Sequence, residues 1–331
     1  MGRWIIRLVV LTALAIAGWW WLATSGLERS IATFWERQRA DGLEVRIADT
    51  VRAGFPLRIA ATQHDVLIID PRTQRELALP EYTLSSPIYW PGDATLSLPA
   101  DPIAIITPQG SFTLTSDGML AAIKLHPGAS LELEALEASG SNLSLDTVEG
   151  QLISIDALQA DVAQTGDPLT YDIDLTATGV ALGSVLRQAM NMPAEWADSF
   201  EPVVADITVT FDRRWDRSAL AGSRPQPRRI QIDQLTAVWS QIGVEASGDL
   251  EVNDQGEPHG ELRVSVQNWQ RIFDMAVATT NIPSKWQSTI EQVLGAMADA
   301  DGTLDLPITM SGGQMRVGFI PLGPSPRLIL R

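Results

Sequence analysis

The sequence contains no cysteine and very little lysine, histidine or tyrosine. The absence of thiols excludes a disulfide scaffold, a thiolate zinc site and a cysteine nucleophile. It is also compatible with location in an oxidising compartment. Basic residues number 24 against 40 acidic ones, which gives a formal net charge of −16. Because nucleic-acid binding needs a basic surface that neutralises phosphate, we expect no nucleic-acid partner. With 331 residues, 45% of them hydrophobic, the chain can bury a sizeable core.

The residue patterns that catalytic and metal sites require are also missing. The three histidines, His64, His126 and His259, form no HxxxH or HExxH pair. The sequence has no GxSxG elbow, no GxxxxGK[ST] phosphate loop and no GxGxxG motif. Residues 299–302 resemble part of a calcium loop, but they lack its other ligand positions and are interpreted as a turn. We therefore expect a protein that is not an enzyme, with no catalytic residues, no cofactor and no metal.

The N-terminus carries a long uncharged run. Residues 8–27 read LVVLTALAIAGWWWLATSGL, and a helix of this length can cross a hydrocarbon core of about 30 Å. Trp4 and Arg7 precede the run and three tryptophans lie in its second half, which agrees with the positive-inside rule and with the aromatic belts of membrane helices. The membrane-anchor residues predicted in this way are Trp4, Arg7, Trp19, Trp20 and Trp21.

These features predict a single-pass protein of the inner (cytoplasmic) membrane with the bulk of the chain in the periplasm. Residues 1–26 would form the cytoplasmic N-terminus and the transmembrane signal-anchor, and residues 27–331 a periplasmic β-rich domain. A cleaved signal peptide is the alternative. It is disfavoured because three tryptophans, rather than a small-x-small motif, follow the apolar stretch.

Beyond this segment, apolar and polar residues alternate with a period of two. Such alternation gives a strand one buried face and one wet face, and it favours antiparallel sheet. Acidic residues such as Asp172, Asp174 and Asp206 fall on the wet face. Residues 248–266 have two alternating arms around a glycine-containing loop and predict a hairpin. The proline-rich residues 80–108 predict short edge strands or extended segments.

Two segments change to the helical period and repeat one pattern, Asn-[Met/Ile]-Pro-x-x-Trp, starting at Asn191 and at Asn281. Asparagine suits a helix N-cap, proline suits the first turn, and the apolar positions that follow form one stripe. Each copy lies between strands, in repeated units around residues 171–212 and 261–308. The predicted fold is mainly β (α+β): an N-terminal transmembrane helix followed by a long curved antiparallel sheet with two inserted helix pairs.

Several of these motifs together resemble the bacterial domain-of-unknown-function family 2125 (DUF2125). They are the N-terminal anchor, Gly54-Phe55-Pro56-Leu57-Arg58, the Pro87…Trp90-Pro91…Pro99 segment and the C-terminal sequence GTLDLPITMSGGQMRVGFIPLGPSPRLIL. That family has no established activity, so the resemblance assigns no functional residues. The anchored, strand-rich layout is also similar to the AsmA-like envelope proteins. This second similarity implies a link to phospholipid movement and outer-membrane integrity, with a sheet that curls into an apolar trough.

Two functions follow as hypotheses. In the first, a cell-envelope protein binds or conveys lipid along an apolar sheet face, with the inner membrane and phospholipid as partners. In the alternative, that face is closed as an ordinary core, and the protein is a non-enzymatic scaffold that binds another envelope protein through a sheet edge or residues 80–108. Alternation selects the trough residues Leu131, Leu133, Ile173, Leu175, Ile207, Val209, Leu250, Val252, Leu262 and Val264.

Overall fold

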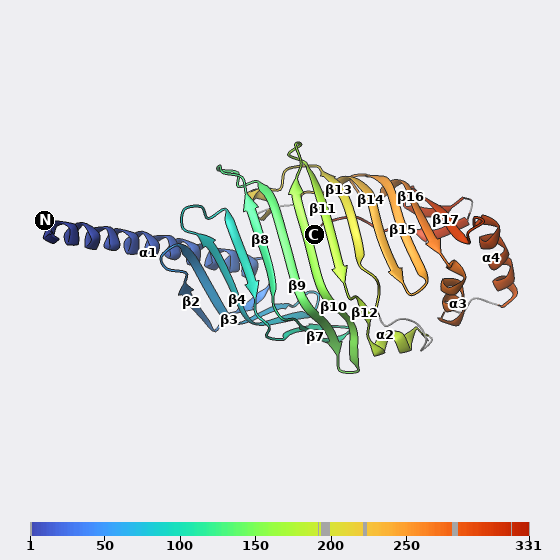
Figure 1. Ribbon diagram of the computed structural model, residues 1–331, viewed down its shortest axis with the longest axis horizontal. Coiled ribbons are helices and arrows are strands. Elements are labelled where there is room, and N and C mark those ends of the chain that lie inside the picture. The colour runs from blue at the N-terminus through green and yellow to red at the C-terminus, as the bar shows by residue number, and fades with distance from the viewer. Residues whose placement is uncertain are drawn as a thin grey trace. The chain divides into compact units, whose positions relative to one another are not determined.

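The computed structural model describes residues 2–190, 192, 199–220, 224–279, 284–318 and 320–330. The chain divides into two compact units. The first unit comprises Met1–Leu125 and Leu143–Val148, and the second comprises His126–Asn142 and Glu149–Arg331. Neighbouring strands pair antiparallel in both units (Figure 1), which confirms the predicted mainly β, antiparallel class.

The first unit combines one long helix with a branched antiparallel sheet. Its elements are α1 (Gly2–Ala40), β1 (Glu44–Arg46), β2 (Asp49–Ala53), β3 (Arg58–Asp70), β4 (Arg75–Pro87), β5 (Asp93–Leu98), β6 (Ile103–Thr107), β7 (Gly110–Thr115), β8 (Met119–Leu125) and the last part of β9 (Leu133–Thr147). Strand β3 pairs with β4 on one side and with β1 and β2 on the other. Strand β4 then pairs with β5 through residues 83–85 and with β6 through residues 76–78.

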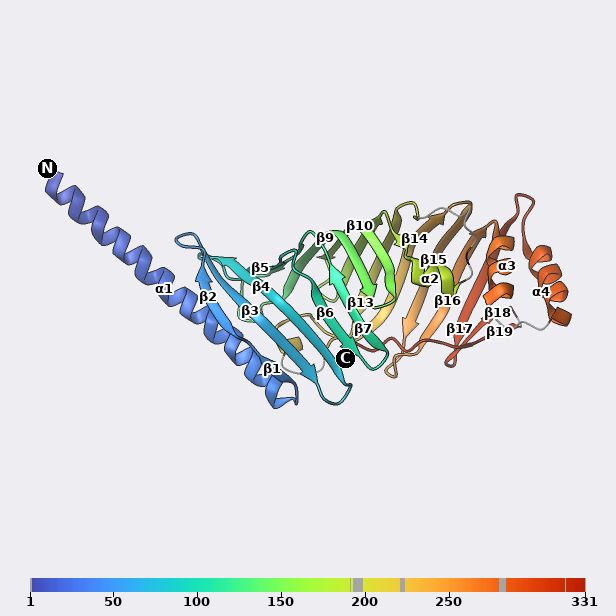
Figure 2. The same cartoon turned by 90° about the horizontal axis from the view of Figure 1, so that it is seen from below.

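Helix α1 lies along the sheet of the first unit, beside β1 and β3 (Figure 2). Ile31 and Trp35 of α1 pack against Ala61 and Val66 of β3 and Tyr82 of β4 to form its core. Among the helices of the described residues, none is both long enough and apolar enough to cross a membrane. The side chains of two predicted anchor residues, Trp4 and Arg7, lie outside the described residues.

The prediction for the proline-rich segment needs one correction. Pro80 lies within the long strand β4 rather than in a short edge strand. It falls between the stretches of β4 that pair with β5 and with β6, and the pairing with β3 is interrupted there, beside Asp65 with its left-handed backbone. A proline is tolerated at this point because no ladder hydrogen bond needs its missing N–H group.

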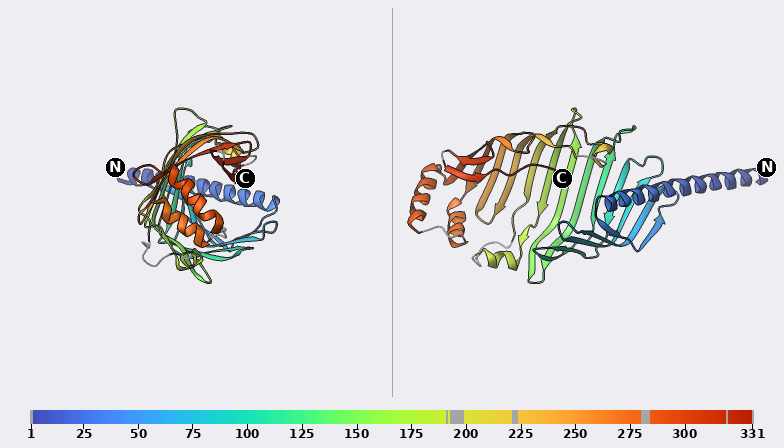
Figure 3. Two further views of the ribbon diagram at one scale, coloured as in Figure 1. Left: turned by 90° about the vertical axis from the view of Figure 1, so that its right-hand side faces the viewer. Right: turned by 180° about the vertical axis from the view of Figure 1, so that it is seen from behind.

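The second unit is an antiparallel meander with a few short helices. Its elements are the first part of β9, β10 (Gly150–Gln164), β11 (Thr170–Thr178), β12 (Ala181–Leu182), α2 (Ser184–Ala189), β13 (Val203–Phe211), the 3-10 helix η1 (Arg217–Leu220), β14 (Pro227–Trp239), β15 (Ile242–Val252), β16 (Pro258–Gln267), α3 (Trp269–Thr279), α4 (Ser284–Met297), β17 (Thr303–Ser311), β18 (Gln314–Val317) and β19 (Ile320–Pro324). From β13 to β19 each strand pairs with the next. Figure 3 shows α3 and α4 at one end of this sheet.

The predicted hairpin and one of the predicted helix pairs are confirmed. Strands β15 and β16 form the hairpin, and α3 with α4 stands between β16 and β17. In the first copy of the repeat, α2 precedes β13. Asn191 and residues 193–198, where the second helix of that copy was expected, lie outside the described residues.

Two glycines allow β15 and β16 to come very close. Gly248 pairs with Leu262, and Gly260 pairs with Leu250. A Cβ atom added to Gly248 would stand 2.4 Å from the carbonyl oxygen of Glu261, a distance that no real Cβ adopts. Since the obstacle is backbone, it cannot move aside as a flexible side chain would.

We expect Gly248→Ala to lower the free energy of unfolding by about 1–3 kcal/mol, because the added methyl group overpacks the strand pair. Gly166→Ala is the control, since nothing lies within 4 Å of its added Cβ. The control should change stability by less than about 0.5 kcal/mol. Urea unfolding of the full chain, followed by circular dichroism, measures both. Equal stability of the two variants would contradict the close approach of β15 and β16.

Candidate functional site: an apolar sheet face

The register of the second unit aligns apolar side chains in rows that run across the strands. One row from β10 to β18 consists of Val162, Ile173, Ile207, Ile232, Gly248, Leu262, Ile308 and Val317. The adjacent row from β10 to β17 consists of Ala160, Leu175, Ala205, Leu235, Ala246, Val264 and Leu306. Directly paired residues project on the same side of a sheet. These two rows, called here the apolar face, therefore form one continuous surface without a charged residue.

The apolar face is closed at both ends and only half-buried between them. At one end Tyr171, Val209 and Phe211 form a buried cluster. At the other end Trp269, the first residue of α3, and Leu304 of β17 are buried and pack with residues of α4. Apart from Val317, which is buried, every residue of the two rows is half-buried. The middle of the apolar face is thus neither a filled core nor an ordinary wet surface.

The structure places five of the ten predicted trough residues in these two rows. Of the two rows, the first contains Ile173, Ile207 and Leu262, and the second contains Leu175 and Val264. The other predicted strand residues lie outside these two rows. Val209, Leu250 and Val252 are buried, and Leu133 packs against the Tyr171 cluster.

Leu131 is the one predicted trough residue that does not lie on a strand. It precedes β9, its φ angle is +52°, and its side chain is 37% exposed. A left-handed residue breaks the alternation of side chains, so counting backwards by two from Leu133 does not give the correct face.

The opposite face of the same strands is acidic. Asp161, Asp174 and Asp206 are directly paired across three neighbouring strands. Burial raises the pKa of Asp206, and repulsion from nearby carboxylates, Asp174 first, adds to the shift. Like charges directly opposite each other destabilise a sheet, so this arrangement has an energetic cost. In the part of the chain that is described, no group of acidic or histidine side chains is arranged to hold a metal ion.

A polar network borders the Tyr171 cluster, and the sequence did not predict it. Glu132, which is 7% exposed, accepts a hydrogen bond of 2.8 Å from Gln164 Nε2 and one of 3.0 Å from Arg214. Gln164 Nε2 also lies 3.2 Å from the hydroxyl of Tyr171, and Gln164 Oε1 lies 2.8 Å from His126 Nε2. Burial raises the pKa of Tyr171. The network joins residues distant in sequence, and because its buried members are satisfied, it is best explained as structural.

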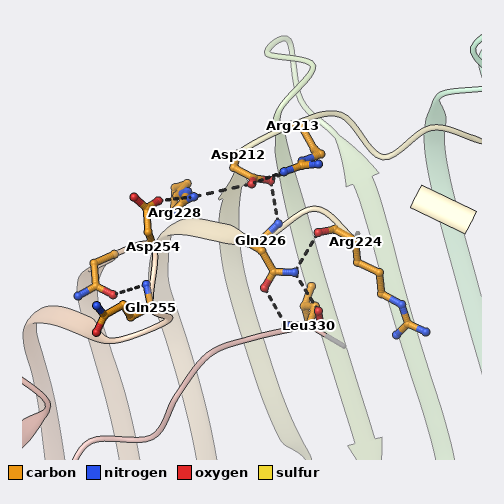
Figure 4. Close-up of polar contacts among 9 residues, drawn as sticks. Asp212, Arg213, Arg224, Gln226, Arg228, Asp254, Gln255 and Leu330 are labelled. Atoms are coloured by element: carbon orange, nitrogen blue, oxygen red, sulfur yellow. Dashed lines mark hydrogen bonds and ion pairs between the residues drawn. The ribbon is translucent and has the colours of Figure 1, made fainter. Parts of the chain in front are cut away.

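The C-terminal residues form a strap across the strand ends of the second unit (Figure 4). The side-chain amide of Gln226 donates to the carbonyl oxygen of Leu330 at 2.8 Å and accepts from its N–H group at 2.9 Å. The N–H of Leu328 donates to Gly256 in the β15–β16 turn, and that of Ser325 to Gly313 in the β17–β18 turn. The strap therefore ties both turns to the start of β14.

The first unit contains a separate cavity of about 520 Å³ beside α1. Trp35 Nε1 on its wall lies 3.1 Å from Gln63 Oε1 and 3.3 Å from the hydroxyl of Tyr82, which also donates to Gln63. Burial raises the pKa of Tyr82. Glu28, another wall residue, is bound by Arg52 through two hydrogen bonds of 2.6 Å. These groups satisfy one another, so the cavity is a weaker candidate for a functional site than the apolar face.

Removing the charge of Asp206 should stabilise the protein at neutral pH. The raised pKa means that the folded state binds the Asp206 proton more tightly than the unfolded state. The carboxylate is therefore destabilising at pH 7, and this effect disappears as the pH falls below the folded and unfolded pKa values. We expect Asp206→Asn to raise Tm at pH 7 and to match the wild type near about pH 3.

Asp216 provides a control of opposite sign. Ser218 donates to its carboxylate from both hydroxyl and backbone N–H, and these hydrogen bonds lower the pKa of Asp216. Asp216→Asn should therefore lower Tm at pH 7, with the loss shrinking in acid. Thermal scans of both variants across this pH range give the test. A lowered Tm for Asp206→Asn at pH 7 would show that the aspartate row does not strain the sheet.

Glu132→Leu should lower the free energy of unfolding by about 1–3 kcal/mol, because Gln164 and Arg214 both lose hydrogen bonds to a buried carboxylate. Glu134→Leu is the control, since the Glu134 side chain is 50% exposed and contacts His126 only at 3.6 Å. That change should remain within about 0.5 kcal/mol of the wild type. Urea unfolding distinguishes the two, and equal losses would show that the network contributes nothing specific.

Comparison with known proteins agrees with the resemblance found in the sequence. No curated protein matches this chain. A family model described as "Uncharacterized protein conserved in bacteria (DUF2125)" matches residues 20–326, which is nearly the whole chain. The matched range contains both the strands that carry the apolar face and the loop at residues 54–58. The chain therefore belongs to the DUF2125 family.

Proposed function

We propose that this protein is an inner-membrane-anchored, periplasmic protein of the bacterial cell envelope that binds lipid acyl chains on the apolar face. One observation carries the proposal: two continuous apolar rows remain half-buried between two closed ends. Leaving apolar area in contact with water is unfavourable by roughly 25 cal/mol per Å². An apolar ligand on this face would remove that cost.

The size of the apolar face suits an acyl chain. The longer row crosses β10, β11 and β13–β18, and with strands about 4.8 Å apart it extends about 34 Å. One leaflet of a bilayer is about 15 Å of hydrocarbon, half of a core of about 30 Å. A single chain could therefore lie along part of the row or move along it.

The charge distribution favours the same face. The paired aspartates of the opposite face would repel anionic headgroups, whereas the two apolar rows carry no charge. The anchor proposal rests on the sequence, namely the uncharged run of residues 8–27 with tryptophans at its far end. A lipid-binding sheet attached to a bilayer has its ligand close by. The layout also agrees with the similarity to AsmA-like proteins, which is a similarity of architecture alone.

The scaffold hypothesis keeps one observation in its favour, the closed ends of the face, where Val209 and Leu250 are buried as in an ordinary core. The scaffold would bind its partner protein through a sheet edge, and the edge strand β19 is poorly suited to this. Pro321 and Pro324 lie in that strand and cannot donate to an added strand.

Photo-crosslinking in cells separates the two functions. A benzophenone amino acid placed at Ile207 lies on the apolar face, and one placed at Thr208, the next residue of β13, lies on the opposite face. We expect lipid adducts, identified by mass spectrometry of the purified full chain, at Ile207 and not at Thr208. No lipid adduct at Ile207 would favour the scaffold, in which this face is a closed core, and equal lipid labelling at both positions would contradict the apolar face as the binding surface.

A substitution at a half-buried position then tests the face with less disturbance than one in a buried cluster. Val264 is half-buried at the margin of the Trp269 cluster, whereas Val209 is 7% exposed inside the Tyr171 cluster, so a polar residue is better tolerated at Val264. Val264→Gln should reduce lipid crosslinking from Ile207 by about tenfold if it removes about 1.4 kcal/mol of binding. Ser265→Gln, on the opposite face of β16, should leave crosslinking unchanged.

A further inference from the structure

The loop between β2 and β3 projects two large apolar side chains into solvent. Leu57 is 74% exposed and Phe55 is 58% exposed. Residues 54–57 carry no charged side chain. Exposed apolar groups that gather in one place mark a surface that meets an apolar partner.

The shape of this loop is fixed by its own backbone. The N–H of Arg58 donates to the carbonyl of Gly54 at 2.9 Å, and the N–H of Ile88 donates to the carbonyl of Leu57 at 3.0 Å. Gly54 has a φ angle of +93°, and a Cβ atom there would stand 2.7 Å from the carbonyl oxygen of Arg58. The fold therefore holds Phe55 and Leu57 outward instead of letting them collapse onto the sheet.

The loop contacts helix α1 at its tryptophans. Trp20 Nε1 donates to the carbonyl oxygen of Arg58 at 2.7 Å, and the ring of Trp20 meets that of Phe55 edge to face with centroids 5.4 Å apart. The neighbouring tryptophans point elsewhere, since Trp19 is 61% exposed and Trp21 is 55% exposed. The loop and Trp20 thus form one apolar patch, and Trp19 and Trp21 are exposed at the same level of the helix.

The burial of α1 changes abruptly at this level. Along the face of α1 that carries Trp20, Ile16 is 45% exposed, whereas Thr24 is fully buried and Ile31 is 7% exposed. Helix α1 therefore enters the first unit immediately after the tryptophans. On the N-terminal side of the tryptophans, the large apolar side chains that are described are exposed to solvent: Leu14 is 64% exposed and Ile16 is 45% exposed.

We propose that the loop of residues 54–57 inserts Phe55 and Leu57 into the headgroup and upper acyl region of the bilayer, beside the tryptophan level of α1. This inference rests on the proposed membrane anchor and adds a second contact to it. The lipid bilayer is the occupant because the patch is continuous, through Trp20, with the uncharged run of the same helix. Tryptophan and other large apolar side chains favour this interfacial region.

The absence of native cysteine allows a direct test with single labels. The full chain, carrying Leu57→Cys labelled with the environment-sensitive dye NBD, is placed in nanodiscs that hold one copy each. We expect its emission to fall about twofold or more when the lipids are brominated near the carbonyl end of the acyl chains, since interfacial residues lie about 5–10 Å deep. Phe55→Cys repeats the measurement at a second position.

Two further labels make the outcomes distinguishable. Val148→Cys is the control, because Val148 is also apolar and is 92% exposed in the same unit, yet lies outside the patch. Ile16→Cys reports on the anchor itself. Quenching at positions 16 and 57 but not at 148 supports the inference. Quenching at 16 alone overturns the loop contact and leaves the anchor, whereas no quenching at either position overturns both.

Discussion

Direct cross-strand pairing in the second unit is the constraint on which the rest of the structure depends. Because side chains alternate with a period of two, a slip of one residue in any strand would move its apolar side chains to the acidic face. For β11 such a slip would place Asp172 and Asp174 among the residues of the apolar face and Ile173 among the aspartates. The cost of burying carboxylates next to apolar side chains therefore fixes the register.

Separate structural elements stabilise the margins of the sheet and leave its middle half-buried. The strap bound by Gln226 ties the strand turns, the Glu132 network braces the Tyr171 cluster, and α3 with α4 packs on the far strands. Only Val264 and Leu306 of the second row are packed against the Trp269 cluster beside α3 and α4. A sheet stabilised in this way can leave apolar area exposed in between, and such an area is what the proposed lipid-binding surface requires.

The sequence predicted those parts that depend on local periodicity. Alternation assigned Ile173, Ile207 and Leu262 to one face, and the helical period found α3 and α4. The assignment by alternation failed at Leu131, where one left-handed residue breaks the period of two. Contacts between distant segments, such as Arg214 with Glu132, leave no local pattern, because an isolated charged residue looks the same whether it is paired or solvated.

Helix α1 links the two membrane proposals through its stiffness. It runs from Gly2 to Ala40 without a break, and its buried residues from Thr24 onwards lock it to the first unit. No flexible linker separates the uncharged run from the folded chain, so any tilt of the helix in a bilayer must also tilt the first unit. The loop at Phe55 and Leu57 then has a mechanical consequence. A second contact at the level of the tryptophans restricts rotation about the helix axis, which a single spanning helix leaves free.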